Sequence, residues 1–420
     1  MTYGFLPATK EEFDRSGIGV PDFVYVSGDA YVDHPSFGAA IITRILDAAG
    51  FSVAVLAQPN FRSTEDFMRY GKPRLGFLVS SGNVDSMVAH YTAAKKKRSD
   101  DWYSPGRRAG LRPDRAVIVY TNRIREAYGD IPVIIGGLEA SLRRFAHYDY
   151  WSDKVRRSIL VDSRADILSY GMGENSIRRI AELLARGVPV KKIRDVRGTA
   201  YLCRRGEKLN FDPVRGTREE PEGYDYDELK TSKAAYAAAF AEQYANNDAV
   251  NGRALVEYYD DRMLAVNPPA FPLEREELDR VYALPYQRTY HPMYEKDGGV
   301  PAIQEVRFSI THNRGCFGGC NFCAIAYHQG RSVRSRSEES VLEEARLLTT
   351  LPDFKGYIHD IGGPARQHWT ATMISRAWRS QCSIPRAAPA RSSACRWQRR
   401  RAPTWQCTLC AATLMMHRPV

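Results

Sequence analysis

The chain has 420 residues, of which 44% are hydrophobic, and it carries a formal net charge of +11. This length allows two or three domains with cores of their own, whereas no uninterrupted apolar run approaches membrane-spanning length, so we expect no membrane segment. The first residues also lack the basic and then apolar pattern of a secretory signal, which predicts a cytoplasmic protein. In such a reducing compartment, eight cysteines indicate metal or cluster binding before disulfides.

Short apolar runs alternate with amphipathic segments over residues 1–200, which we predict to form an N-terminal α/β domain. Strands are expected at residues 23–27, 53–56, 75–79, 116–120, 132–135 and 167–170, and helices at residues 38–49 and 176–186. This alternation favours a doubly wound, mostly parallel sheet with helices on both faces. Ligands of such folds bind beyond the carboxyl ends of the strands.

Glycines and polar side chains follow the first, third and fifth of these strands. After the fifth strand, Gly136 and Gly137 are compatible with a tight turn and with ligand contact. After the first strand, Asp33, His34 and Gly38 read D-H-x-x-x-G, similar to the D-x-H-x-x-G motif of cobalamin-binding domains but with the wrong spacing. We therefore expect a cobalamin-binding-like fold without bound cobalamin. His34 then caps its loop or contacts substrate, with a metal-ligand role as the alternative.

A basic segment over residues 93–115 contains the aromatic residues Trp102 and Tyr103 and the acidic residues Asp100 and Asp101. Basic residues interleaved with aromatic ones can hold single-stranded nucleic acid. Because acidic residues are mixed into the segment, a solvated surface loop is the favoured interpretation, and nucleic acid is not the expected partner.

Residues 201–300 are predicted to form a helical and proline-rich connecting region. Residues 206–227 are charged and contain two prolines, which is typical of a surface excursion. Residues 231–246 predict a helix on which Tyr236, Phe240 and Tyr244 recur every four residues as a packing stripe. The proline-punctuated residues 267–294 are expected to wrap from the first domain onto the second.

The segment from residue 309 to residue 331 carries three cysteines, Cys316, Cys320 and Cys323, in a C-x3-C-x2-C array that follows a strand predicted at residues 305–310. Three thiolates on one short glycine-bearing loop can hold three corners of a cubic iron–sulfur cluster. The fourth iron then has no protein ligand. The alternatives are a zinc site, for which a second C-x2-C pair at zinc-finger distance is missing, and ordinary buried thiols.

The run C-F-G-G-C-N-F-C resembles the signature of radical S-adenosylmethionine (SAM) proteins. The resemblance implies a 4Fe-4S cluster on Cys316, Cys320 and Cys323, with SAM chelated at the open iron and cleaved to a 5′-deoxyadenosyl radical after one electron arrives from an external donor. Protein groups around such a cofactor supply orientation and exclude water.

A strand–loop–helix–strand unit is expected around this loop, as the start of a radical SAM barrel over residues 301–364. A helix over residues 338–348, capped by Ser335 or Ser337, precedes a strand over residues 356–361. The resemblance puts Gly362 and Gly363 beside the methionyl amino group of SAM. Pro364 replaces the glutamate of the usual G-G-E, which leaves Asp360 as a substitute carboxylate and a plain turn as the alternative.

Motifs spread over residues 3–364 resemble the YgiQ-type radical SAM family; they include GDAYVDHPSFGAAII, GGLEASLRRFAHYDYWSDKVRRSIL, LPYQRTYHPMY and HNRGCFGGCNFCAIAYHQGR. The resemblance implies a cobalamin-binding-like N-terminal domain, then a radical SAM (β/α) barrel, and an enzyme whose substrate is unassigned. Such a barrel needs roughly 200 residues, of which only about 60 in this chain match the family. We therefore expect the barrel to be incomplete and the activity to be impaired.

Residues 365–420 differ in composition from the rest of the chain. They hold ten arginines, four cysteines and four tryptophans but no acidic residue, so the preceding 364 residues carry a net charge of only about +1. This abrupt change in amino-acid composition predicts a frameshift near Pro364. Cys382, Cys395, Cys407 and Cys410 resemble a zinc half-site, which is accidental under that hypothesis.

Three other functions compete with a radical SAM enzyme of unknown substrate. A methylthiotransferase is disfavoured, because it would use three further N-terminal cysteines and only Cys203 precedes the motif. A cobalamin-dependent radical SAM methyltransferase is the first alternative. A non-enzymatic nucleic-acid-binding protein, motivated by the basic tail and the segment after Ala93, is the second.

Overall fold

The computed structural model describes residues 4–318, 320 and 323–363. Its central feature is a nine-stranded sheet in the order β10-β11-β12-β9-β8-β5-β4-β1-β3. Its strands are β1 (Phe23–Ser27), β3 (Val53–Ala57), β4 (Gly76–Ser80), β5 (Val133–Ile135), β8 (Ile167–Ser169), β9 (Thr199–Arg204), β10 (Tyr224–Asp225), β11 (Leu255–Tyr259) and β12 (Arg262–Val266). Smaller elements of the first domain are α1 (Lys10–Arg15), η1 (Asp66–Met68), α3 (Ser86–His90), η2 (Pro105–Arg107), α5 (Gly137–Leu142), β6 (His147–Asp149), β7 (Lys154–Arg156), α6 (Ile159–Ser163) and η3 (Val190–Lys192).

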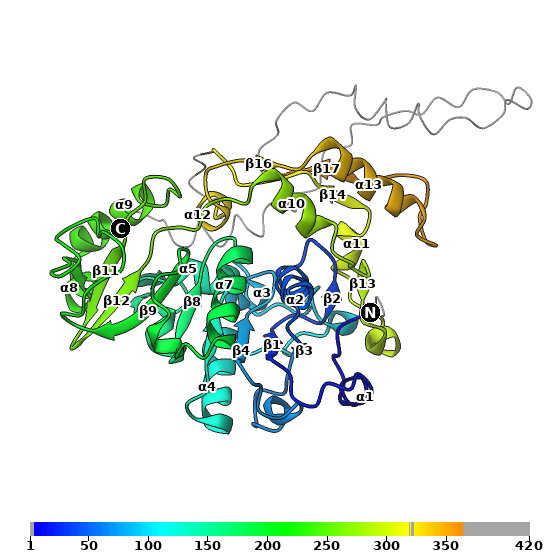
Figure 1. The fold of residues 1–420 in the computed structure, drawn as a ribbon, viewed down its shortest axis with the longest axis horizontal. Helices are drawn as coiled ribbons and strands as arrows, with labels where there is room; N and C mark the ends of the chain where they lie inside the picture. Colours follow the sequence, from blue (N-terminus) through cyan, green and yellow to red (C-terminus); the bar gives the residue numbers. More distant parts are fainter. Residues whose placement is uncertain (1–3, 319, 321–322, 364–420) are drawn as a thin grey trace, which may run out of the picture.

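The five strands β3, β1, β4, β5 and β8 run parallel, which confirms the predicted α/β class. Helices α2 (Gly38–Ala48) and α7 (Glu174–Ala185) pack against one face, and α4 (Ala116–Tyr128) against the other (Figure 1). A hydrophobic core lies on each face of the sheet, and successive side chains of β1 point to opposite faces. Phe23 belongs to the core that contains α2 and α7, and Val24 belongs to the core that contains α4. The sheet is therefore doubly wound, as the sequence predicts.

The strand predicted at residues 116–120 is wrong, because these residues begin helix α4. Its buried residues Ala116, Val117, Tyr120 and Ile124 recur at helical spacing and join the core. A short apolar run does not distinguish a buried strand from a buried helix, and the helical period appears only when the following residues are included.

The sheet continues past residue 200 through antiparallel pairs of β8 with β9, β9 with β12 and β12 with β11. The domain boundary predicted at residue 200 thus falls inside β9, and the region predicted as a connection also supplies β10, β11 and β12. Helices α8 (Tyr226–Thr231) and α9 (Lys233–Ala245) follow β10, which confirms the helix predicted over residues 231–246. The residues that α9 buries are Ala239 and Gln243, whereas Tyr244 of the predicted packing stripe is exposed.

A buried carboxyl group in β11 makes stability depend on pH. Glu257 is 2% exposed and accepts hydrogen bonds from the Ala146 amide and the Tyr259 hydroxyl, both at 2.8 Å. Burial raises its pKa to about 7 from 4.5, so the folded state holds this proton more tightly than the unfolded chain does. Its contribution to the free energy of unfolding is therefore lost as pH rises from about 4.5 to about 7.

We expect Glu257→Gln to gain about 2–3 kcal/mol in unfolding free energy relative to wild type between pH 5 and pH 8, because glutamine does not ionise. Urea unfolding at both pH values measures this difference. Glu276→Gln, at an exposed position of α10 (Arg275–Tyr282), is the matched control and is expected to leave the pH dependence unchanged. Parallel pH profiles for wild type and Glu257→Gln would contradict the assignment.

The proline-punctuated segment returns onto the first domain. Strand β13 (Thr289–Tyr290) pairs antiparallel with β2 (Val32–Asp33), and η4 (Pro292–Asp297) follows it. The Tyr31 amide donates a hydrogen bond to the Tyr294 hydroxyl at 3.0 Å. This segment therefore joins the core of the N-terminal domain before the chain enters the next unit.

The described part of the second unit has one strand–helix–strand repeat. It comprises α11 (Ile303–Val306), β14 (Ser309–Thr311), β15 (Asn313–Arg314), α12 (Ile325–Gln329), β16 (Arg334–Ser335), α13 (Glu338–Thr349) and β17 (Asp360–Gly362). Strands β14 and β17 pair in parallel, and the Ser337 hydroxyl accepts the Ser340 amide at the start of α13, as predicted. The unit is a (β/α) step, with its strands shorter than the expected residues 305–310 and 356–361.

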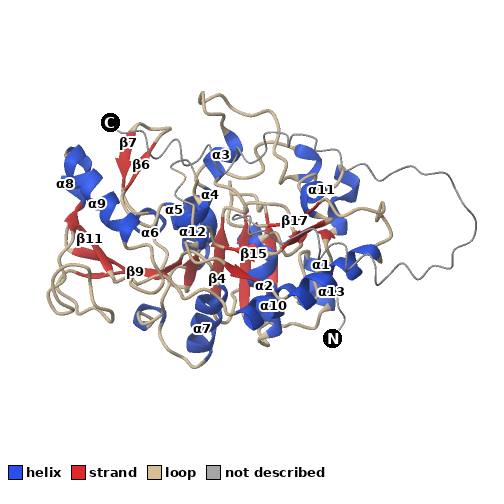
Figure 2. Ribbon diagram, turned by 90° about the horizontal axis from the view of Figure 1, so that it is seen from above, coloured by secondary structure: helices blue, strands red, loops and turns tan. Residues whose placement is uncertain are grey.

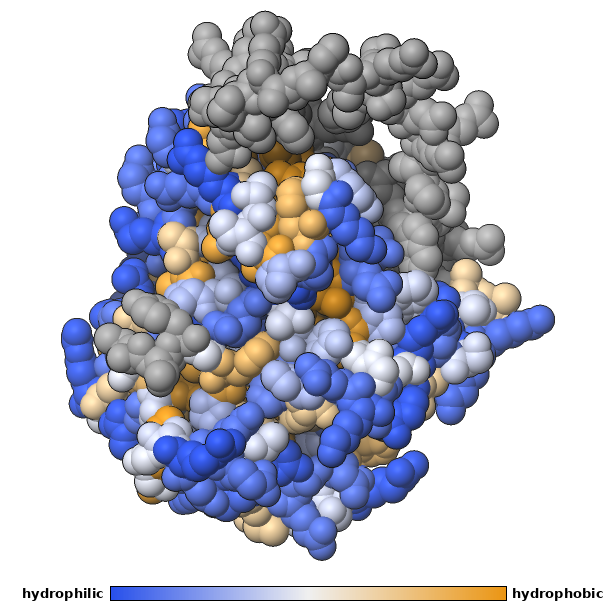
Figure 3. All heavy atoms as spheres, turned by 90° about the vertical axis from the view of Figure 1, so that its right-hand side faces the viewer, coloured by the Kyte–Doolittle hydropathy of each residue, from blue (hydrophilic) through white to orange (hydrophobic). Residues whose placement is uncertain are grey.

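This second unit lies over one end of the N-terminal domain (Figures 1 and 2). Its small core contains Phe308, Ile310, Val341 and Leu348, while Leu347, Tyr357 and Ile361 remain exposed at 38–55%. Figure 3, which faces the side that carries α13, shows apolar groups gathered among polar ones on this part of the surface. The tail at residues 365–420, with its four cysteines, lies outside the described residues. Within the described ranges, every helix is too short or too polar to cross a bilayer.

Candidate functional site

The cysteine loop begins and ends at a narrow base formed by β15 and β16, which we call the neck. Strand β15 pairs antiparallel with β16, so the two ends of the loop are held together. The Cys316 amide donates to the Gly330 carbonyl oxygen at 3.1 Å, and the Gly315 amide donates to Oε1 of Gln329 at 3.1 Å. Gly315 has a φ of +80°, a conformation that favours glycine. The neck therefore fixes where the first cysteine emerges.

Two of the three sulfurs flank Gly318. The Gly318 amide donates to Sγ of Cys316 at 3.4 Å, and a Cβ added to Gly318 would lie 3.3 Å from Sγ of Cys316 and 3.8 Å from Sγ of Cys320. Cys320 is exposed, and Cys316 and Cys323 are half-buried. An amide that donates to a sulfur, and cysteines that are exposed or half-buried, suit thiolates that ligate a cluster. Across the described ranges no three His, Cys, Asp or Glu side chains converge as a metal site, so the three-cysteine ligand set stays a prediction.

We expect Gly315→Ala to lower the iron content of the reconstituted protein several-fold, because its Cβ would lie 2.2 Å from the Ser332 carbonyl oxygen and force the neck open. Gly187→Ala is the matched control: its φ of +79° carries a similar strain of about 1–2 kcal/mol, but nothing lies within 4 Å of the added Cβ. Iron analysis after reconstitution measures the effect. Equal iron in the two variants would show that the neck does not control the loop.

Helix α12, which ends the cysteine loop, docks on the N-terminal domain through Arg144. The guanidinium of Arg144 lies between two aromatic rings, 4.5 Å from the centroid of Tyr170 and 4.2 Å from that of Tyr327. Nδ2 of Asn247 donates to the carbonyl oxygens of Ala326 and Tyr327, both at 3.2 Å. These contacts hold the loop at the carboxyl end of β8, which precedes Tyr170.

The strand before the cysteines is tied to the same edge of the sheet. Arg314 is buried, pairs with Glu174 at the start of α7 and donates to the Tyr282 hydroxyl at 3.1 Å. Burial opposes the charge of Arg314, but Tyr282 and Glu174 outweigh it and raise its pKa. On α12, burial and the charge of Arg144 lower the pKa of His328 to about 4, so this imidazole is neutral.

The predicted SAM glycines lie beside the strand that leads to the cysteines. The His312 amide donates to the Gly362 carbonyl oxygen at 2.8 Å, and a Cβ on Gly363 would lie 2.1 Å from Oδ1 of Asn313. A Cβ on Gly362 would lie 2.9 Å from Oδ1 of Asp360, so this carboxylate lies beside Gly362. The structure thus brings Gly362, Gly363 and Asp360 close to the base of the cysteine loop.

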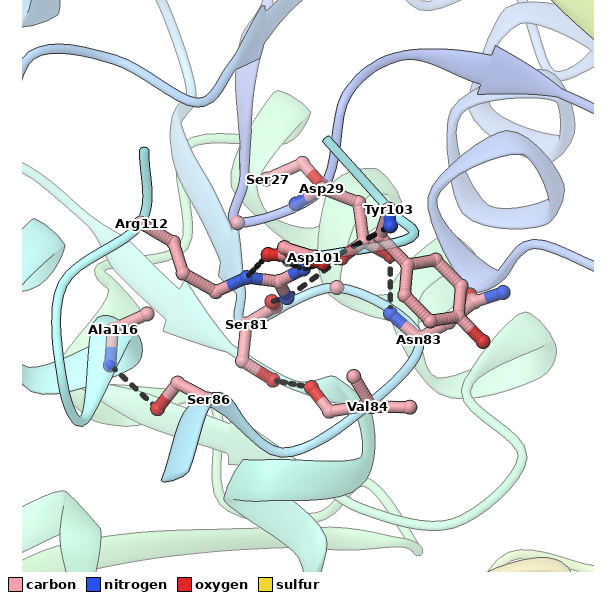
Figure 4. Close-up of polar contacts among 12 residues, drawn as sticks. Ser27, Asp29, Ser81, Asn83, Val84, Ser86, Asp101, Tyr103, Arg112 and Ala116 are labelled. Atoms are coloured by element: carbon pink, nitrogen blue, oxygen red, sulfur yellow. Dashed lines mark hydrogen bonds and ion pairs between the residues drawn. The ribbon is translucent and has the colours of Figure 1, made fainter. Parts of the chain in front are cut away.

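A buried ion-pair network, the Arg112 network, fills the carboxyl edge of the parallel sheet between β1 and β4 (Figure 4). Nη1 of Arg112 lies 2.7 Å from Oδ1 of Asp29, and its Nε donates to Oδ2 of Asp101 at 2.9 Å. Burial raises the pKa of Asp29 to about 6, against the lowering effect of Arg112. Arg112 and Asp101 are only 1% and 4% exposed, so the expectation of a solvated loop over residues 93–115 is wrong for this part.

The Arg112 network lies at the place in the sheet where a doubly wound fold usually binds its ligand. Strand order β3-β1-β4 places the topological switch of the sheet between β1 and β4, where doubly wound folds bind ligands. Here a Cβ on Gly28 would lie 2.2 Å from the Ser81 carbonyl oxygen, and one on Gly82 would lie 2.0 Å from Asp29. Protein groups occupy the crevice.

His34 is fully buried, and its Nδ1 accepts the Ser36 amide at 3.1 Å, which is the loop-capping geometry. Burial and the charges of Arg288 and Arg307 lower its pKa, so it is neutral. Gly136 and Gly137 form the turn from β5 into α5, and a Cβ on Gly136 would lie 3.2 Å from the Ser169 carbonyl oxygen. These contacts fit the turn interpretation.

Sequence reasoning missed the residues that join the loop to the sheet, above all Arg144, Arg314 and Glu174. Their signal in the sequence is weak, because Arg144 stands in an RR pair and its two ring partners lie 26 and 183 positions away. Glu139 was also missed. Its carboxylate accepts the amides of Ser86 and Val117 at 2.9 and 3.2 Å, near the starts of α3 and α4.

Comparison with protein families gives a match to the model described as Radical SAM N-terminal over residues 5–309. The chain is similar to a UPF0313 protein of Clostridium botulinum (strain 657 / Type Ba4), with 54% identity over 393 residues that cover 91% of this chain and 60% of that protein. It is likewise 54% identical over 360 residues to a UPF0313 protein of Clostridium perfringens (strain ATCC 13124), which covers 86% of this chain and 53% of that one. The chain therefore spans about 60% or less of the length of these relatives.

Among solved structures, the chain is similar to the radical S-adenosylmethionine methyltransferase TsrM from Kitasatospora setae, solved with cobalamin and a 4Fe-4S cluster bound. The sequence identity is 15% and the TM-score 0.43, and the match covers 85% of this chain and 50% of that one.

Proposed function

This chain belongs to the radical SAM family that includes the UPF0313 proteins, and we propose that its cysteine loop binds a 4Fe-4S cluster and S-adenosylmethionine as part of a radical SAM enzyme. The observation that carries the proposal is the pair of sulfurs of Cys316 and Cys320 on either side of Gly318, above a neck held by β15 and β16. Cys316, Cys320 and Cys323 are its cluster ligands. When bound, the cluster supplies one electron that opens a carbon–sulfur bond of SAM.

The residues of this chain have distinct tasks in the proposal. The Gly318 amide, which donates to Sγ of Cys316, stabilises the thiolate form of a ligand. Gly362 and Gly363, whose backbone lies close to Asp360 and Asn313, would face the methionyl amino group of SAM, and the Asp360 carboxylate would accept a hydrogen bond from it. Arg144, which packs on the ring of Tyr327, holds α12 against the N-terminal domain.

A cobalamin-dependent methyltransferase remains the second candidate. The Arg112 network argues against it, because Asp29, Asp101 and Arg112 occupy the crevice at the switch of strand order where doubly wound folds hold ligands. His34, moreover, uses Nδ1 for its own loop and has no exposed surface. Absorption by bound cobalamin after incubation and gel filtration would favour this candidate, and unbound cobalamin would remove it.

Anaerobic reconstitution with iron and sulfide tests the proposal on the full chain. We expect about four iron and four sulfide per chain, and a change in the electron paramagnetic resonance of the reduced cluster when SAM is added. Release of 5′-deoxyadenosine after reduction then reports SAM cleavage. Protein without iron and sulfide, or a cluster whose spectrum ignores SAM, would overturn the proposal.

A further inference from the structure

A turn and a hairpin that are far apart in the sequence form one basic and aromatic surface. The turn at residues 91–98 carries three exposed lysines, Lys95, Lys96 and Lys97. The hairpin β6–β7 brings Tyr150 against the first of them: Nζ of Lys95 lies 4.6 Å from the centre of the Tyr150 ring. We call this set, with Trp151 and Lys154 of the hairpin, the lysine–tyrosine surface.

The lysine–tyrosine surface is held in place by the backbone of the turn. The Thr92 amide donates to the Lys96 carbonyl oxygen at 2.8 Å, and the Arg98 amide donates to the His90 carbonyl oxygen at 2.7 Å. The Tyr150 hydroxyl donates to the Ala93 carbonyl oxygen at 2.8 Å, which joins the hairpin to the turn. The lysines are therefore presented from a preformed scaffold.

The charge of the surface is unbalanced. Lys96, Lys97 and Lys154 have no ion-pair partner among the residues that the structure describes. The nearby carboxylates of Asp114 and Asp153 accept hydrogen bonds from the hydroxyls of Tyr91 and Tyr148 and keep their charge, but the cations Lys95, Lys96, Lys97, Arg98 and Lys154 outnumber them. Residues 1–364 are nearly neutral as a whole, so this is a local positive field.

Aromatic side chains continue from this surface to the cysteine loop. The Tyr148 amide of the hairpin donates to the Tyr236 hydroxyl of α9 at 2.9 Å. Further along α9, the rings of Phe240 and Tyr244 lie 6.1 Å apart. Tyr244 is 39% exposed and lies 4.3 Å from the guanidinium of Arg331, two residues beyond α12. Figure 2 shows the hairpin and α9 toward one end of the molecule and α12 nearer its middle.

We propose that the lysine–tyrosine surface and the aromatic edge of α9 bind a single-stranded polynucleotide, the substrate class of the proposed enzyme. Lysines set beside half-buried Tyr150 and Trp151 and exposed Tyr244 match phosphates that alternate with bases, because the cations neutralise the backbone and bases can stack on aromatic rings. An acidic peptide would use the charge and leave the rings unused. The aromatic edge of α9 leads to the cysteine loop. The polynucleotide is therefore assigned as a substrate on the basis of the proposed function of that loop.

Fluorescence anisotropy of a labelled single-stranded RNA of about 20 nucleotides, and of DNA of the same sequence, tests the proposal on the full chain. Lys96→Ala with Lys97→Ala is expected to weaken binding about tenfold near 0.15 M salt and to lower the salt slope by about 1.4. Lys191→Ala with Lys192→Ala is the matched control: it removes the same charge at exposed lysines, where Lys191 lies 3.6 Å from Asp130 near the amino end of β5. Both variants keep the ten arginines of residues 365–420.

Tyr150 separates stacking from charge. Tyr150→Phe loses the hydrogen bond to Ala93 but keeps the ring, and is expected to bind almost as wild type, whereas Tyr150→Leu is expected to bind about fivefold more weakly. Tighter binding of RNA than of DNA would identify the ribose as part of the ligand, and equal binding would assign the site to either polymer.

Equal weakening by the two lysine pairs, or equal competition by polyglutamate of matched charge, would overturn the proposal. These measurements need no iron or sulfide, so failure of polynucleotide binding and failure of cluster assembly are separate results.

Discussion

Replacing Cys316, Cys320 or Cys323 with alanine is expected to reduce the iron and sulfide bound after reconstitution to less than about a tenth of the wild-type amount. Three thiolates hold three of the four irons of the cluster, and the fourth iron has no protein ligand. Each substitution therefore leaves two irons without a protein ligand. Formation of 5′-deoxyadenosine is expected to disappear in all three variants. Iron and sulfide analysis, the absorption of the cluster and product release measure the effect.

Cys203→Ala is the matched control for these substitutions. Cys203 is buried in β9, its thiol donates to the Met263 carbonyl oxygen at 3.6 Å, and burial raises its pKa to about 11. It is therefore an inert thiol and its removal is expected to leave the cluster intact. Wild-type iron in Cys316→Ala would contradict the ligand assignment, as would loss of iron in Cys203→Ala alone.

Arg112→Leu is expected to lower the free energy of unfolding by about 3–5 kcal/mol at pH 8, because Asp29 and Asp101 would remain buried without their shared cation. Folded Asp29 has a pKa of about 6, above the ordinary 3.8, so its proton is held more tightly in the folded state. The deficit of the variant is therefore expected to shrink as pH falls from 8 to 5, as the Asp29 carboxyl group becomes neutral. Urea unfolding at both pH values measures it.

Arg108→Leu is the control for this variant, since Arg108 is exposed and lies 3.6 Å from Asp297. It is expected to cost about 0–1 kcal/mol. Asp29→Asn added to Arg112→Leu is expected to restore part of the loss, because it removes one of the two unpaired charges. Similar costs for Arg112→Leu and Arg108→Leu would show that the Arg112 network contributes little to stability.

Much of the N-terminal fold could be predicted because its signals are local. Residues 23–27 and 53–57 are continuous apolar runs, and α7 alternates buried Ile177, Ile180 and Leu184 with polar side chains at helical spacing. The run at residues 116–120 misled because five apolar residues satisfy a strand and a helix equally. The antiparallel extension of the sheet was missed because its pairing joins distant segments, as in Leu202 with Leu264.

The candidate site likewise has residues that local sequence motifs reveal and residues that only the tertiary structure reveals. The cysteines and the glycine pair lie in short motifs that can be found by inspection, and the structure brings the base of the loop and the end of β17 side by side. The groups around them depend on tertiary contacts: Arg112 stands in a run that looks like a solvated basic loop, yet Asp29, its partner, is 83 positions earlier. Charge alone does not indicate burial, because an arginine is buried only where the fold supplies a partner.

The pairing of β2 with β13 has a consequence for synthesis of the chain on the ribosome. Asp33 of β2 leaves the exit tunnel well before Arg288, whose amide donates to the Asp33 carbonyl oxygen and which follows 255 positions later. At about 5–20 residues per second, this gap corresponds to roughly 13–50 s. For that time the nascent chain leaves the edge of β2 without its partner strand, and such an edge can pair with another chain.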